Sequence, residues 1–214
     1  MAVAARIYTP AEAAAVSGIA VKAVHNAIDK KIVETKADPR PRGVARRALT
    51  REGLLRLTLW HSIGSSLSAE RRERLFEAIT AMPNARTVRA ADLLIVDVAT
   101  ARKRLDARIR ALDEAEAAIH RDKGVLGGEP VFRGTRIPAR AIAAMLAQGA
   151  SAEEILEGYP ALTLRMLDLA TIWATAHPAR GRPKTLHEQG LSPKSTRRLA
   201  LKSDPQPRRP GAAG

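Results

Sequence analysis

Residues 125–142, VLGGEPVFRGTRIPARAI, interrupt a chain whose apolar residues otherwise recur mostly at helical spacing. The glycine pair allows backbone conformations that other residues rarely adopt, and Pro130 cannot continue a helix. The VFR run that follows favours a short strand ending at Gly134, and Pro138 suits the start of a new helix. The stretch therefore predicts a strand and a turn that lead into a helical unit.

Three helices are expected after this turn. The first has one apolar face and ends near Gly149. Ser151 and Glu154 have the spacing of a capping box at the start of the second helix. Thr163 is placed to cap the third, LRMLDLATIWATA. The sequence therefore predicts a compact three-helix domain over residues 123–176.

The order of motifs in this domain resembles a known family. The spacing GGEPVFRGTRIP…AQGASAEEILEGYPALT, within residues 125–176, closely resembles domain-of-unknown-function family 433, which is associated with antitoxins. The resemblance implies a VapB-type antitoxin of a type II toxin–antitoxin system, which inhibits a PIN-domain (VapC-type) ribonuclease and binds its own operator DNA. This chain has further helices that the short members lack, which leaves open which helical unit reads DNA.

The arginine-rich turn does not have the spacing of a nucleotide-binding loop. A P-loop requires G-x-x-x-x-G-K-[ST], but Glu129 stands where the first glycine belongs and no lysine precedes Thr135. The side chains of Arg133, Thr135 and Arg136 are therefore expected either to contact DNA or to brace the turn through backbone carbonyls.

The N-terminal residues have the pattern of a helix-turn-helix. Thr9, Pro10 and Glu12 form a capping-box start for a short helix. Gly18 then supplies a tight turn before a second helix, whose apolar residues recur at i, i+3 and i+7. The outer face of that helix carries Lys22, His25, Asn26, Asp29 and Lys30, among which the donors suit phosphates and base edges.

A basic hairpin is expected next, because two β-prone ends flank a Pro- and Gly-rich loop in residues 32–49. Its arginines are Arg40, Arg42, Arg46 and Arg47. Residues 6–60 resemble the winged helices of the MerR and excisionase group, which implies that Lys22, His25 and Asn26 face the DNA major groove and the arginines touch its backbone. The alternative is a solvated basic loop beside an ordinary pair of core helices.

Residues 61–122 are predicted to form a helical linker and dimerisation region. A helix with Ser68 as its cap and a β-like run, ADLLIVDV, precede a long helix, ATARKRLDARIRALDEAEAAIHR. One apolar face of this helix packs on the scaffold or on a dimer partner, since a second coiled-coil seam is missing. A homodimer is expected because operator half-sites are usually read by two-fold related modules. The apolar residues at seven-residue spacing are Val98, Leu105, Leu112 and Ile119.

Charge separates the ends of the chain from its middle. The net charge is +14, of which residues 1–60 carry +6, residues 61–174 carry +1 and residues 175–214 carry +7. The tail, residues 177–214, has too few large apolar residues to form a core alone, and it is either a basic segment that holds nucleic acid loosely or the inhibitory segment. The resemblance implies the second role, in which an arginine enters the carboxylate site of the ribonuclease. The residues assigned to toxin binding are Arg180, Arg182, Lys184, Leu186 and Leu191.

An enzymatic function is not predicted. The chain has no cysteine and five scattered histidines, so neither a metal site nor a cofactor is expected. Asp92 and Asp97 lack a nearby His or Lys, which favours a capping or solvent-facing role over acid–base chemistry.

The expected fold is mainly α with short β elements. It comprises a winged helix-turn-helix (1–60), a helical middle region (61–122), a three-helix domain (123–176) and an extended basic tail (177–214). No signal peptide or membrane span is apparent, which indicates a cytoplasmic protein without membrane contact. The alternative to an antitoxin is a stand-alone winged-helix regulator or a recombination accessory factor.

Overall fold

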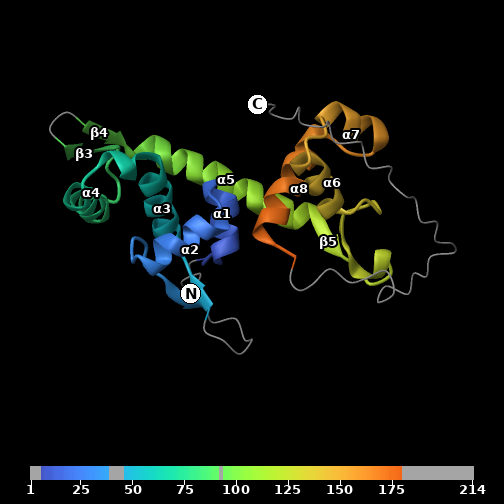
Figure 1. Ribbon diagram of the computed structural model, residues 1–214, viewed down its shortest axis with the longest axis horizontal. Helices are drawn as coiled ribbons and strands as arrows, with labels where there is room; N and C mark the ends of the chain where they lie inside the picture. Colours follow the sequence, from blue (N-terminus) through green and yellow to red (C-terminus); the bar gives the residue numbers. More distant parts are fainter. Residues whose placement is uncertain (1–5, 39–45, 92–93, 180–214) are drawn as a thin grey trace, which may run out of the picture. The chain divides into compact units, whose positions relative to one another are not determined.

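The computed structural model describes residues 6–38, 46–91 and 94–179, which are mainly helical with short antiparallel strand pairs (Figure 1). This agrees with the predicted class, mainly α with short β elements. Within these ranges, no helix combines the length and the apolar character needed to cross a bilayer. The residues assigned to toxin binding, Arg180 to Leu191, lie outside the described residues.

Two short helices, a strand pair and a longer helix form the N-terminal segment. The Glu12 N–H donates to Thr9 Oγ1 at 3.2 Å and the Thr9 N–H donates to Glu12 Oε2 at 2.6 Å, which completes the predicted capping box. Gly18 has φ of 68° and ends the first helix in a conformation that favours glycine. The elements are α1 (Pro10–Ser17), α2 (Val21–Asp29), β1 (Lys36–Asp38), β2 (Arg46–Ala48) and α3 (Arg51–Ile63).

A second strand pair lies before the long helix. The sequence pattern predicts the later of these strands but not the earlier one, β3, because its arginine and alanines have little β propensity. Val88 and Ala90 of β3 are nevertheless buried, and Val88 lies opposite Val96, so cross-strand packing stabilises the pair. The elements here are η1 (Gly64–Ser66), α4 (Ala69–Ala81), β3 (Thr87–Ala91), β4 (Leu94–Asp97) and α5 (Val98–Ala118).

The long helix α5 is shorter at its end than the sequence predicts. Residues 119–121 form a strand, β5 (Ile119–Arg121), which pairs antiparallel with β6 (Pro130–Phe132) and places Ile119 opposite Phe132. The Arg133 N–H donates to the Ala118 carbonyl at 2.8 Å and takes up one of the carbonyls at the helix end. The predicted helix through Arg121 is therefore wrong, because a strand partner beyond a glycine turn outweighs local helix propensity.

Predicted side-chain caps begin two of the last three helices. The Glu154 N–H donates to Ser151 Oγ at 3.1 Å, and the Met166 N–H donates to Thr163 Oγ1 at 3.3 Å. The elements after β5 are η2 (Leu126–Gly128), β6, α6 (Ala139–Ala147), α7 (Ala152–Gly158) and α8 (Leu164–Ala176).

Helix α5 contributes to two hydrophobic cores. Leu105 and Leu112 are buried in the N-terminal core, which packs α1 to α5 and also includes Ala176 of α8. Ala115 of α5 and Ile119, just beyond it, are buried in the C-terminal core with Phe132 and the apolar faces of α6, α7 and α8. The apolar stripe of α5 thus packs on the chain's own scaffold, the first of the two predicted alternatives for it.

Candidate nucleic-acid interface

The outward face of α2 is built as its spacing predicts. Val24, Ala27 and Ile28 are buried against the N-terminal core. The opposite face is exposed and carries Lys22, His25, Asn26, Asp29 and Lys30. A helix that presents two lysines, an imidazole and an amide to solvent offers donors for phosphates and base edges.

The strand pair β1–β2 is joined to α2 by an ion pair. Arg47 lies on β2, opposite Ala37, and its Nη1 donates to Asp29 Oδ1 at 2.7 Å. Both side chains are more than 60 % exposed, so the pair adds little to stability. Its effect is electrostatic, because Arg47 compensates the one carboxylate on the outward face of α2, which would otherwise repel phosphates.

The other predicted arginines of this hairpin are only partly described. Arg46 contributes its backbone to β2, opposite Asp38. Arg40 and Arg42 lie in the segment 39–45, outside the described residues. The interface that the structure describes therefore consists of the α2 face and Arg47.

The arginine-rich turn between β6 and α6 bonds to itself and to the end of α5. Arg133 Nε donates to the Ala117 carbonyl at 3.1 Å. Thr135 Oγ1 donates to the Phe132 carbonyl at 2.9 Å and accepts from the Ile137 N–H at 3.1 Å. The hydrogen bonds of Arg133 and Thr135 to backbone carbonyls are those expected of residues that stabilise the turn. Arg136 is exposed at the same turn.

Asp97 serves as a helix cap. Its Oδ1 accepts from the Thr100 N–H at 2.8 Å and its Oδ2 accepts from Thr100 Oγ1 at 2.7 Å, at the start of α5. These hydrogen bonds from Thr100 lower the pKa of the Asp97 carboxyl, which favours its ionised form. Asp92 lies outside the described residues. Within the described ranges, no group of three or more His, Asp or Glu side chains is placed to hold a metal ion.

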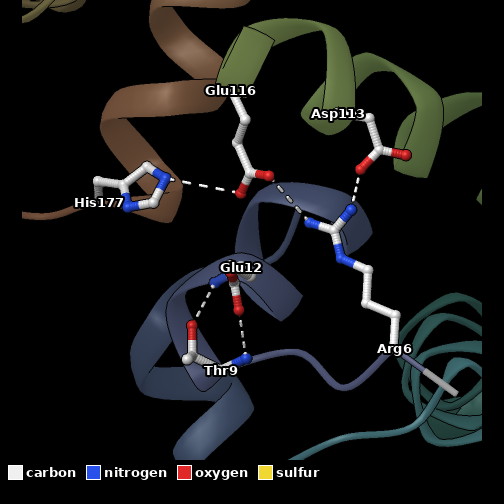
Figure 2. Close-up of polar contacts among 6 residues, drawn as sticks. All are labelled: Arg6, Thr9, Glu12, Asp113, Glu116 and His177. Carbon is white, nitrogen blue, oxygen red and sulfur yellow. Dashed lines mark hydrogen bonds and ion pairs between the residues drawn. The ribbon is translucent and has the colours of Figure 1, made fainter. Parts of the chain in front are cut away.

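A polar cluster, which the sequence does not reveal, ties the N-terminal segment to α5 (Figure 2). Arg6 forms an ion pair with Asp113, and its Nη2 lies 3.3 Å from Glu116 Oε2. The other carboxylate oxygen, Oε1 of Glu116, lies 3.8 Å from His177 Nε2. Since Arg6 is separated from its partners by more than 100 residues, no local pattern signals the contact.

The imidazole of His177, directly after α8, is partly buried, which disfavours its charged form. Burial lowers the pKa of this imidazole, and Arg140 and Arg121 lower it further, against the opposing effects of Glu116 and Glu12. The His177 ring also lies 4.7 Å from the ring of Trp173. Arg6 and His177 thus both approach Glu116 of α5, which links the residues before α1 and the end of α8 to the same helix.

The family model that matches this chain covers part of its C-terminal half. Residues 119–174 match a family model described as "Protein of unknown function (DUF433)". The match begins at β5 and ends within α8, so it includes the arginine-rich turn. It confirms the resemblance predicted over 125–176, and the family's description assigns no activity.

The relatives found are themselves of unassigned function. The uncharacterized protein y4eO of Sinorhizobium fredii is 35 % identical over 111 residues, which are 51 % of this chain and 50 % of that protein. The chain thus spans about half the length of this relative. A crystal structure of a DUF433 member protein from Anabaena variabilis is 26 % identical, covers 52 % of this chain and 91 % of its own, and has a TM-score of 0.28.

Proposed function

We propose that this protein binds DNA through the outward face of α2 and the adjoining β1–β2 hairpin. The observation that carries the proposal is the arrangement of Lys22, His25, Asn26 and Lys30 on one exposed helix face, beside a strand pair whose Arg47 compensates Asp29. A helix with these donors fits the major groove, and basic strands beside it fit the phosphates.

Within this proposal, the biological role is that of an antitoxin of a type II toxin–antitoxin system. The tail, residues 177–214, inhibits a cognate PIN-domain ribonuclease, and the α2 face binds the operator to regulate the operon. The resemblance of residues 125–176 to an antitoxin-associated family motivates this role, and the net charge of +7 in residues 175–214 fits a tail that binds clustered carboxylates. The protein acts in the cytoplasm as a homodimer within the complex, and it has no catalytic activity or cofactor of its own.

DNA recognition is tested by fluorescence anisotropy of the full chain with a duplex from upstream of its own gene. Asn26→Ala removes a bidentate base contact, so it lowers the ratio of specific to random-sequence affinity by about 5- to 150-fold (1–3 kcal/mol). The matched control is Gln148→Ala, which removes an exposed amide directly after α6, outside α2. An Asn26→Ala variant with the specificity ratio of the wild type contradicts the assignment of α2.

The antitoxin role is tested separately, by co-expression with the product of the adjacent reading frame. The full chain forms a stable complex and neutralises the toxin, and a chain that ends at Ala176 does not. Neutralisation that survives this truncation contradicts the assignment of the tail.

A second candidate function is a stand-alone DNA-binding regulator or recombination accessory factor. This function is favoured by the position of the family match, which begins at residue 119. Helices α1 to α5, including the α2 face, lie before that residue, so the part proposed to bind DNA is separate from the part that matches the family. Specific DNA binding without any complex with the neighbouring gene product supports this function over the antitoxin role.

A further inference from the structure

A hollow of about 420 Å³ lies on α5, and none of its lining residues is among those assigned to DNA above. It is bounded by the start of α3, the loop before β3 and one side of α5, and it opens to solvent. Its polar lining residues are Arg51, Asn84, Arg102, Lys103, Asp106 and Arg110. Four cations thus surround a single carboxylate, which gives the lining a net charge of +3.

The carboxylate in the hollow is already occupied. Arg51 donates from Nη2 to both oxygens of Asp106, at 2.6 and 2.7 Å, and from Nε to Oδ1 at 2.9 Å. This multidentate pair fixes the Arg51 guanidinium and uses the acceptor capacity of Asp106. The remaining positive charge of the hollow is therefore uncompensated by its own lining.

The three remaining cations differ in how they are held. Arg102 Nη1 donates to the Ala85 carbonyl at 2.8 Å, which fixes this guanidinium at the wall. Lys103 and Arg110 are exposed, and neither forms a hydrogen bond or ion pair with any residue that the structure describes. Two unengaged cations thus stand beside two fixed ones, and the amide of Asn84 adds a donor at the same place.

We propose that this hollow is an anion site that binds a phosphate group, carried either by a small phosphorylated molecule or by a nucleic-acid backbone. A phosphate group offers several acceptor oxygens and negative charge, which match a guanidinium fork, an ammonium and an amide. The hollow, of about 420 Å³ and open to solvent, has room for a phosphate group and part of the molecule that carries it. Like charges held in one hollow repel each other, and a bound anion removes that repulsion.

The test uses the full chain and a double variant, Lys103→Ala with Arg110→Ala, which removes the two unengaged cations. The control is Arg89→Ala with Arg104→Ala, which removes equal charge from exposed positions outside the hollow. Pyrophosphate is titrated at low ionic strength and followed by amide chemical shifts. The wild type and control saturate, with the largest shifts at Asn84, Arg102 and Lys103, and the hollow variant binds at least 10-fold more weakly.

A DNA arm identifies the source of the phosphate. The slope of log DNA affinity against log salt concentration is compared between the hollow variant and the control. A slope that is smaller in the hollow variant, by up to about two units, indicates that the bound phosphate belongs to a nucleic-acid backbone. Loss of pyrophosphate binding with an unchanged salt slope indicates a small phosphorylated ligand. Hollow and control variants that behave alike in both arms overturn the proposal. The pyrophosphate arm needs no DNA, so its result is independent of the proposed function.

Discussion

Leu112→Ala is predicted to destabilise the protein strongly, because this side chain lies in the N-terminal core on the helix that both cores share. Leu112 is fully buried, with 0 % of its surface exposed. Truncation to alanine removes about three carbon groups from an apolar environment, which at about 0.8 kcal/mol each gives roughly 2.4 kcal/mol. The cavity that remains raises the expected loss of unfolding free energy to about 3–4 kcal/mol.

The assay for this prediction is urea denaturation of the full chain, followed by far-UV circular dichroism. The control is Leu164→Ala, at an α8 residue that is 61 % exposed, where a change within about 0.5 kcal/mol is expected. The midpoint of the Leu112→Ala variant falls while the denaturant slope stays the same. A loss below about 1 kcal/mol, or one equal to that of Leu164→Ala, refutes the packing of α5 described above.

Three further predictions concern local contacts. Ser151→Ala removes the side-chain acceptor of the α7 capping box and lowers the free energy of unfolding by about 1 kcal/mol, whereas Ser151→Gly costs only a few tenths, as urea midpoints will show. Gly134→Ala lowers the free energy of unfolding by about 1 kcal/mol, because φ at this turn residue is +77°. Gly158→Ala, at the helical end of α7, is neutral or stabilising. Equal urea midpoints for the two variants contradict the left-handed backbone described at Gly134. Because the pKa of His177 is lower in the folded state, the unfolded chain binds more protons, and stability is lost as pH falls below about 6.5. Urea titrations at several pH values will show a smaller loss for the His177→Gln variant. A pH profile equal to that of the wild type argues against the burial of this imidazole.

Local signals in the sequence predict the helix starts well. Thr9, Ser151 and Thr163 each accept from the backbone N–H three residues later, as their capping patterns predict. The apolar stripe through Leu105 and Leu112 is likewise buried as the spacing predicts. These features depend on residues within one or two turns of each other, so they can be read without knowledge of the fold.

Features that depend on distant partners are missed. The strand β5 follows a long helical pattern and forms because Ile119 pairs with Phe132 across a glycine turn. The ion pairs of Arg6 with α5 join residues more than 100 positions apart. The pairing of Arg47 with Asp29, which determines the charge of the α2 face, is also invisible until the hairpin is placed beside the helix.

The candidate site is predictable in part for the same reason. Helical spacing alone predicts that Lys22, His25 and Asn26 share an exposed face, as the structure has it. The basic hollow on α5 is not predictable, because Arg51 and Asn84 reach it from other elements.

The central claim is that the α2 face and its hairpin bind DNA, and the salt dependence of DNA affinity tests it most directly. The full chain is compared with a Lys22→Ala, Arg47→Ala double variant and with the Arg89→Ala, Arg104→Ala control over about 50–200 mM salt. Loss of two positive charges from the interface, one of which compensates Asp29, lowers the log–log slope by about two units in the first variant only. A slope in the Lys22 and Arg47 variant that equals those of the wild type and the control contradicts the account.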